Sequence, residues 1–199
     1  MSKHFQSIFQ QHEADVARGK FLSRVFGIFS EDIVRLWAKD DRSPYEDLGR
    51  PTVKHNGVAK GYTLDFTLRH AETGKTYITE LKCEIEYQNY RYLVLTETSQ
   101  LEHHRKPAFG TLLGVAKKKD EYTVVVNKEK IEVDGALLIW GAATDEGRET
   151  VRNSCGFADI LTMADIINDL QKWKHKDFNK LIEDRRGWTN ELFDQLRSP

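Results

Sequence analysis

The chain has 199 residues, of which 31% are charged and 39% are hydrophobic, and its formal net charge is −1. This length fits one domain, spanning residues 1–199, with a sizeable core. The charge balance excludes a protein that binds nucleic acid through an overall basic surface. No apolar run approaches the about 20 residues that cross a membrane, and the N-terminus has no signal-peptide core. Two cysteines provide no disulfide framework, which predicts a cytoplasmic protein.

Two helical segments are predicted at the start of the chain. Residues 3–18 carry a moderate apolar stripe, and residues 20–40 carry a stronger one with helical spacing. Within the second segment Ser30 is a candidate N-cap, in which case Gly27 marks a break and Glu31 belongs to a new first turn. Loop signals follow at residues 40–44 and 49–51, and a short strand is predicted at 52–55.

A hairpin is predicted from strands at 62–69 and 76–86, because both segments alternate with period 2. Tyr62, Leu64, Phe66 and Leu68 are expected to share one apolar face. Asp65 on the first arm and Glu80 and Lys82 on the second lie on the polar faces. A tight turn in either neighbouring odd register places Asp65 directly opposite Glu80 or Lys82, with the other residue as a diagonal neighbour.

Two carboxylates one strand spacing apart can hold a hard divalent cation, which prefers oxygen ligands. A lysine beside that cation can orient or deprotonate an attacking water. The structural alternative is a solvated sheet face, on which charged residues such as Glu80 and Lys82 pair with residues of a neighbouring strand.

The second half of the chain is expected to continue the alternation of helices and strands. Residues 87–106 are predicted to form a helix that ends at Pro107, and residues 107–121 a loop with a basic tip. Segments 122–127 and 129–133 favour a second hairpin, either a simple extension of the sheet or an arm that faces a ligand. Residues 135–141 form an uninterrupted apolar run typical of a strand buried on both faces. A helix at 145–153, a strand at 157–161, a helix capped by Thr162 and a helical tail follow.

Asp65, the gap of fourteen residues and Glu80-Leu81-Lys82 resemble the D…(D/E)-x-K signature of the PD-(D/E)XK nuclease superfamily. The family's leading proline is replaced by Leu64. The predicted order of helix, three strands, helix and strand over residues 20–141 matches the αβββαβ core of that superfamily. The resemblance therefore implies an α/β fold with a restriction-endonuclease-like core, in which a mixed sheet is flanked by helices. The extra hairpin and a helical C-terminal extension at 142–199 lie outside that core.

The resemblance also implies a function and a site. Asp65, Glu80 and the Leu81 carbonyl would bind Mg²⁺, with Mn²⁺ as a substitute, and Lys82 would position the attacking water. Gly27-x-x-x-Glu31 resembles the family helix from which a glutamate reaches the metal; the alternative for Glu31 is a capping-turn acid. Glu84 would hold a second metal or pair with a cation such as Arg69.

The expected enzyme is a type II restriction endonuclease-like deoxyribonuclease that binds double-stranded DNA as a homodimer and needs no nucleotide cofactor. The residues expected to contact DNA are basic: Arg69, Arg105, Lys106, Lys117 and Lys118. For the basic residues before Pro107, a solvated helix end is an equal alternative. The rival functions are a Holliday-junction or repair nuclease of the same fold and a catalytically silent nucleic-acid-binding or protein-interaction domain. A glycosidase fits less well, because a lysine between the two acids would keep both ionised.

Overall fold

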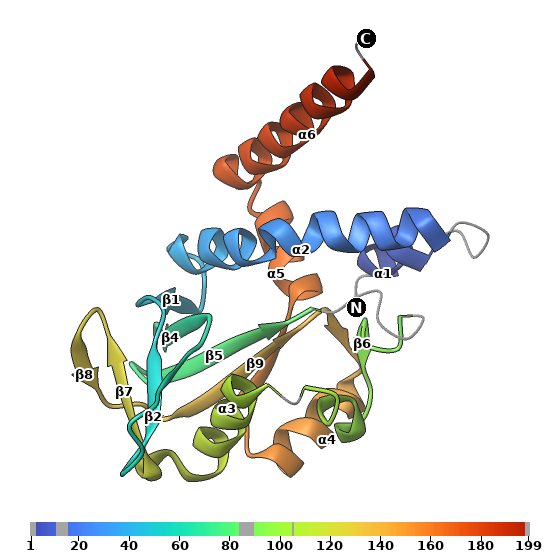
Figure 1. Cartoon of the computed structure of the whole chain (residues 1–199). Coiled ribbons are helices and arrows are strands. Elements are labelled where there is room, and N and C mark those ends of the chain that lie inside the picture. Colours follow the sequence, from blue (N-terminus) through green and yellow to red (C-terminus); the bar gives the residue numbers. More distant parts are fainter. Residues whose placement is uncertain (1–2, 11–15, 84–89, 105, 198–199) are drawn as a thin grey trace.

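The computed structural model describes residues 3–10, 16–83, 90–104 and 106–197. The chain is an α/β protein in which a mixed, curled sheet lies between two layers of helices (Figure 1). The layer on one side contains α1 (Lys3–Gln10), α2 (Val16–Lys39), α5 (Met163–Lys172) and α6 (Lys176–Arg197). The layer on the other side contains α3 (Pro107–Lys118) and α4 (Asp145–Cys155).

The main sheet has five strands in the order β1-β4-β5-β9-β11. Its bounds are β1 (Tyr45–Asp47), β4 (Phe66–His70), β5 (Thr76–Lys82), β9 (Gly135–Trp140) and β11 (Asp159–Thr162). The first three strands pair antiparallel, whereas β5, β9 and β11 are parallel to one another. Because parallel neighbours need a crossover, α3 connects the β5 side of the sheet to β9 and packs on both strands.

A second sheet has four strands in the order β3-β2-β7-β8. Its bounds are β3 (Tyr62–Thr63), β2 (Thr52–His55), β7 (Tyr122–Val126) and β8 (Glu129–Ile131). A separate parallel pair joins β6 (Val94–Leu95) to β10 (Ala142–Ala143). The 3₁₀ turns η1 (Thr98–Leu101) and η2 (Lys119–Glu121) complete the elements. The predicted strand at 52–55 and the predicted hairpin after residue 121 are confirmed, and both belong to this second sheet.

Two apolar cores lie on the two faces of the main sheet. The core under α2 and α5 includes Trp37, Phe66 and Leu137, and the core under α3 and α4 includes Phe109 and Trp140. Every residue of β9 is buried, which confirms the prediction of a strand covered on both faces. Alternate residues of β9 supply the two cores, so this strand joins them.

The prediction of one continuous strand at residues 62–69 is wrong. Residues 62–63 pair in the second sheet and residues 66–70 in the main sheet, with a bend at Asp65 between them. As a consequence Leu64 faces the core under α3, whereas Phe66 and Leu68 face the core under α2. The first strand of the main sheet is instead the short β1, which the sequence pattern did not predict.

The prediction of a helix at residues 87–106 is wrong over the part that the structure describes, residues 90–104 and 106. Gln100 is buried, and its side-chain oxygen accepts the amides of Thr96 and Glu97 at 2.7 and 3.0 Å. Its side-chain nitrogen donates to the carbonyls of Arg91 and Val94 at 2.6 and 2.9 Å. These bonds satisfy backbone groups that a helix would otherwise pair internally, so the segment forms β6 and a 3₁₀ turn.

The prediction of a loop at residues 107–121 is also wrong, because most of this segment is α3. Pro107 begins the helix rather than ending one, because proline lacks only an N–H that the first turn of a helix would leave unpaired in any case. Phe109, Leu112 and Val115 are buried at helical spacing. A Cβ at Gly114 would lie 1.9 Å from the hydroxyl of Tyr122, so glycine permits close packing here rather than a turn.

The remaining predicted helices are present in the structure, with differences at some of their ends and caps. The first predicted helix is present as α1 (Lys3–Gln10), while residues 11–15 of its predicted range lie outside the described residues. Helix α2 runs through Gly27 without a break. Ser30 is therefore not an N-cap; its hydroxyl donates to the Gly27 carbonyl at 3.2 Å. Thr162 does cap α5 as predicted, because its hydroxyl accepts the Asp165 amide at 3.0 Å.

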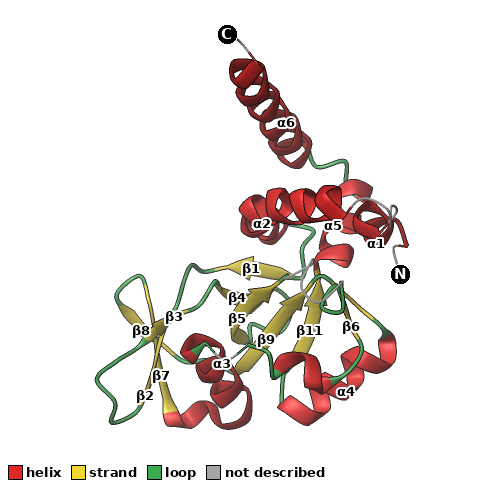
Figure 2. Cartoon of the chain, turned by 45° about the vertical axis from the view of Figure 1, so that its right-hand side comes forward, coloured by secondary structure: helices red, strands yellow, loops and turns green. Residues whose placement is uncertain are grey.

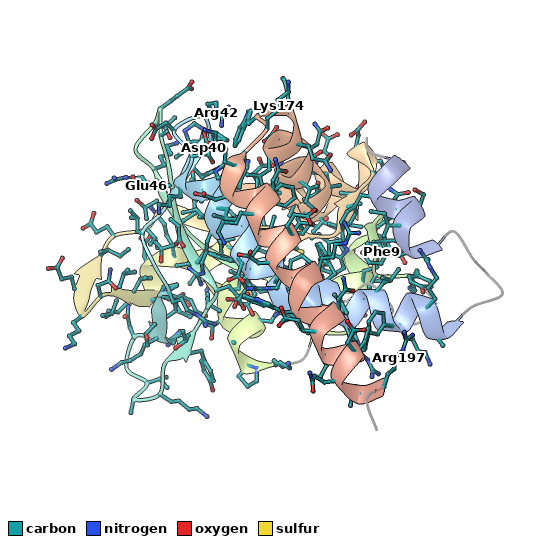
Figure 3. The ribbon with its side chains drawn as sticks, turned by 90° about the horizontal axis from the view of Figure 1, so that it is seen from above. Phe9, Asp40, Arg42, Glu46, Lys174 and Arg197 are labelled. Atoms are coloured by element: carbon teal, nitrogen blue, oxygen red, sulfur yellow. The ribbon has the colours of Figure 1, made fainter. Side chains whose placement is uncertain are left out.

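The C-terminal helix α6 projects from the rest of the chain (Figures 1 and 2). Seen from above it crosses α2, with Arg197 at its free end (Figure 3). Arg185 pairs with Asp32 of α2 at 2.9 Å, and the rings of Phe21 and Phe193 are 6.2 Å apart. Among the described helices, none has the length and apolar character that crossing a bilayer requires.

Candidate active site

Asp65 lies where the chain leaves the second sheet and enters the main sheet. Phe66 and Thr79 form the end pair of the β4–β5 ladder, and Asp65 precedes that pair. The Asp65 carboxylate accepts the Leu81 amide through Oδ2 at 2.9 Å, just beyond the end of this ladder. Continuation of the ladder would place Asp65 opposite Glu80, one of the two predicted registers. The bend thus positions a carboxylate at the edge of the Glu80-Leu81-Lys82 segment.

Glu80 and Lys82 point toward the core under α3. Lys82 Nζ lies 2.6 Å from Glu80 Oε1, and the exposed fractions of the two side chains are 15% for Lys82 and 8% for Glu80. Lys82 Nζ also lies 5.9 Å from the centroid of the Phe109 ring. The second carboxylate oxygen, Glu80 Oε2, is buried and has no hydrogen-bond partner among the described residues. The pair is therefore covered by α3 and does not lie on a solvated sheet face.

Burial raises the pKa of Glu80 above its ordinary value. The nearby Lys82 ammonium opposes this shift, and the Asp65 carboxylate adds to it. Acids whose pKa is raised by burial and by a second nearby acid are common in functional sites, and they also occur in structural ion-pair networks.

The raised pKa predicts how pH changes the stability of the metal-free protein. In the pH range between the ordinary and the raised pKa, the folded state holds the Glu80 proton more tightly than the unfolded state. The stability of the wild type relative to Glu80→Gln should therefore fall as the pH rises from about 4.5, and then level off. Thermal melts with a chelator present measure this difference, which should correspond to about 2–4 °C for each kcal/mol in a chain of this size. A difference that does not vary with pH would show that Glu80 titrates normally.

The carboxylates fit a divalent cation in their donor chemistry. Within the described part of the chain, Glu80 Oε2 is a buried acceptor without a partner, and Asp65 Oδ1 faces Arg50 at 3.4 Å. The resemblance implies the Leu81 carbonyl as a third ligand. All three donors are oxygen atoms, which Mg²⁺ prefers as ligands. The described residues contain no group of three or more His, Cys, Asp or Glu arranged for a metal. Glu84, which was predicted either to hold a second metal or to pair with a cation such as Arg69, lies outside the described residues.

Glu31 is connected to the site through an arginine. Arg35 lies 3.5 Å from Glu31, 2.8 Å from Asp47 and 3.5 Å from the Asp65 carbonyl. Its guanidinium also lies 4.9 Å from the centroid of the Phe66 ring. Arg35 therefore connects α2, β1 and the start of β4, and Glu31 helps to hold it.

Those predicted DNA-contacting residues that the structure describes do not gather at one place. Arg69 lies four residues from Asp65 along β4, about 13 Å away in an extended strand, and pairs with Glu46 at 2.5 Å. Lys106 precedes α3 near the Phe109 end, whereas Lys117 and Lys118 lie in its last turn. That spacing of about 11 residues corresponds to about 17 Å along a helix. Lys118 pairs with Glu121 at 3.0 Å, and Arg105 lies outside the described residues.

Two arginines of the site were missed by the sequence interpretation. Arg35 lies on a helical face with no distinguishing pattern, and Arg50 lies in a loop signalled only by its Gly-Arg-Pro context. Both reach Asp65 through contacts between residues that are far apart in the chain, so no local pattern in the sequence indicates them.

An apolar groove of about 500 Å³ lies elsewhere, between α1, α2, α5 and α6. Its walls include Phe5, Phe9, Phe26, Ile167 and Phe178. Neither Asp65 nor the Glu80-Lys82 pair borders it, so the carboxylate site and this groove are separate features.

The chain matches no known family model, no curated protein and no solved structure.

Proposed function

We propose that this chain is a magnesium-dependent DNA endonuclease of the PD-(D/E)XK type, with a restriction endonuclease-like activity. The observation that carries the proposal is the convergence of Asp65, Glu80 and Lys82 at the end of the β4–β5 ladder. Lys82 pairs with Glu80 at 2.6 Å, and Asp65 accepts the Leu81 amide at 2.9 Å. These are the acid, acid and lysine of the D…E-x-K pattern.

The strand order adds support for this type of fold. Along the main sheet and the helices that cover it, α2 is followed by β1, β4 and β5, then by α3 and β9. Strands of the other two sheets are inserted between these elements. The first three strands of the main sheet are antiparallel neighbours and the fourth joins β5 in parallel, with α3 on one face and α2 on the other. This arrangement supports the αβββαβ core that the resemblance implies, in which β1 rather than the predicted segment 52–55 would be the first strand.

The proposed reaction is hydrolysis of a phosphodiester bond by water. A bound magnesium ion would lower the pKa of a water molecule and neutralise charge that develops on the phosphate. Asp65 and Glu80 would hold the ion, and Lys82 would orient the attacking water by hydrogen bonding. As the resemblance implies, attack at phosphorus would break the bond to the 3′ oxygen, which takes up a proton, and would leave 5′-phosphate and 3′-hydroxyl ends.

One observation favours a catalytically silent domain on the same fold. Each of the two acids already has a cation, since Arg50 approaches Asp65 and Lys82 pairs with Glu80. The Asp65 carboxylate also has a structural role, because it accepts a hydrogen bond from the Leu81 amide. A purely structural polar cluster would contain the same contacts, so only a test of metal-dependent DNA cleavage distinguishes the nuclease from the silent domain.

The test is incubation of the purified protein with supercoiled plasmid and with a four-way DNA junction, with Mg²⁺ or with a chelator. We expect magnesium-dependent cleavage: a discrete plasmid pattern for a restriction enzyme, or branch-dependent cuts for a junction nuclease. Light scattering on the same sample tests the proposed homodimer, which would bring two sites to two strands. Binding of DNA without cleavage under any divalent cation would favour the silent domain.

A further inference from the structure

Arg50 lies beside the proposed metal ligand Asp65 but belongs to a different part of the chain. It is in the loop between β1 and β2, and its Nη2 lies 3.4 Å from Asp65 Oδ1. The exposed fraction of the Arg50 side chain is 52%, compared with 15% for Asp65. An exposed guanidinium therefore stands on the solvent side of a mostly buried carboxylate.

The backbone around Arg50 is held in place on both sides. Gly49 adopts a φ of 113°, which favours glycine, and its amide donates to Asp47 Oδ1 at 2.9 Å. Pro51 is buried, and its carbonyl accepts the Leu64 amide at 3.0 Å. The loop thus keeps Arg50 next to the bend at Asp65, while the long, exposed side chain has room to change its rotamer.

The two acids of the site are paired unequally. Glu80 pairs with Lys82 at 2.6 Å, and Lys82 is 15% exposed. Asp65 pairs with Arg50 at 3.4 Å, and Arg50 is 52% exposed. Exposed ion pairs contribute little to stability, because water screens them and the side chains lose conformational freedom. The Arg50 contact is therefore the one that an arriving cation would displace.

We infer that Arg50 has two alternative partners. In the metal-free protein it binds Asp65 Oδ1, and when a divalent cation takes that oxygen Arg50 turns to a phosphate group of the DNA backbone at the site. This inference rests on the proposed nuclease function and adds a phosphate-binding residue to it. A guanidinium suits both partners, since its planar set of donors matches carboxylate and phosphate oxygens alike.

The first measurement is Mn²⁺ binding without DNA, by calorimetry, for the wild type and Arg50→Met. Removal of a competing cation should tighten Mn²⁺ binding by about two- to fivefold, the range expected for losing one weak surface pair. Arg148→Met is the matched control, because Arg148 pairs with Asp165 at 2.6 Å on α4 and α5, away from β5. Its Mn²⁺ affinity should equal that of the wild type.

The second measurement is DNA binding with Mg²⁺, compared between Lys82→Met and the double variant Lys82→Met/Arg50→Met. Lys82→Met is used so that the DNA stays intact during the titration. Loss of one phosphate contact should weaken binding by about tenfold or more and reduce the salt-dependence slope by about 1. The same change in an otherwise wild-type chain should slow cleavage.

Tighter metal binding together with weaker DNA binding supports the inference. A merely structural role for Arg50 would not change the metal affinity and the DNA affinity in opposite directions. Weaker metal binding in Arg50→Met would overturn it and would indicate that Arg50 only orients Asp65. If the wild type binds metal and cleaves DNA but Arg50→Met changes neither, the inference fails and the proposed function stands. If the wild type neither binds Mn²⁺ nor cleaves DNA, the proposed function itself fails.

Discussion

Asp65→Asn and Glu80→Gln should each remove magnesium-dependent DNA cleavage, with a loss on the order of 10³-fold in the single-turnover rate. Each change replaces a negative metal ligand with a neutral amide of the same shape. In Asp65→Asn the new side-chain carbonyl can still accept the Leu81 N–H, which the Asp65 carboxylate accepts at 2.9 Å. Asp65→Ala would be a poorer test, because it would leave that backbone amide without its acceptor.

Thermal melts and Mn²⁺ calorimetry separate loss of function from loss of fold in these variants. The expected result is a folded protein with weakened metal binding. Glu46→Gln serves as the control, since Glu46 is an exposed acid on β1 that pairs with Arg69, two strands from β5. Its cleavage rate should match the wild type. Wild-type cleavage by either site variant would remove the nuclease hypothesis.

Lys82→Arg and Lys82→Met should each lower the cleavage rate by about 10²-fold or more, the scale of a positioned acid-base group. Arginine keeps the positive charge but is bulkier and planar, so it does not fit the same position between Glu80 and the Phe109 ring. If Lys82 only balanced the charge of Glu80, the Arg variant would be nearly neutral. Metal binding should persist in Lys82→Arg, because both carboxylates remain.

The measurement for Lys82 is single-turnover plasmid cleavage, with magnesium affinity followed by calorimetry on the same samples. Lys180→Met is the control, since Lys180 pairs with Asp184 on the exposed surface of α6 at 2.5 Å. It removes a lysine–carboxylate pair that lies outside the proposed site. Unchanged cleavage in both Lys82 variants would mean that the D…E-x-K string is a structural ion-pair cluster of this sheet.

Elements with strong local periodicity were predictable from the sequence. The apolar run of β9, the hairpin of β7 and β8, and the cap of α5 at Thr162 all depend on residues within one segment. The near pairing of Asp65 with Glu80 was also predictable, because a short turn leaves few registers open. The proposed catalytic residues come from this part of the prediction.

Other features were decided only by contacts between distant segments. A single buried side chain, Gln100, holds residues 91–97 out of a helix, whereas packing of Phe109 and the close approach of Tyr122 to Gly114 make a helix of the predicted loop. Residues 62–69 divide between two sheets because Leu64 packs in the core under α3, whereas Phe66 packs in the core under α2.

The site divides in the same way. The convergence of two acids and a lysine was predictable from the chain alone, because period-2 alternation and a short turn are local properties. Packing between distant segments places α3 over these side chains and leaves one Glu80 oxygen unpaired among the described residues. The same packing brings Arg35 from α2 and Arg50 from the β1–β2 loop to Asp65. These features depend on which elements pack together, and packing between distant segments leaves no periodic pattern in the chain.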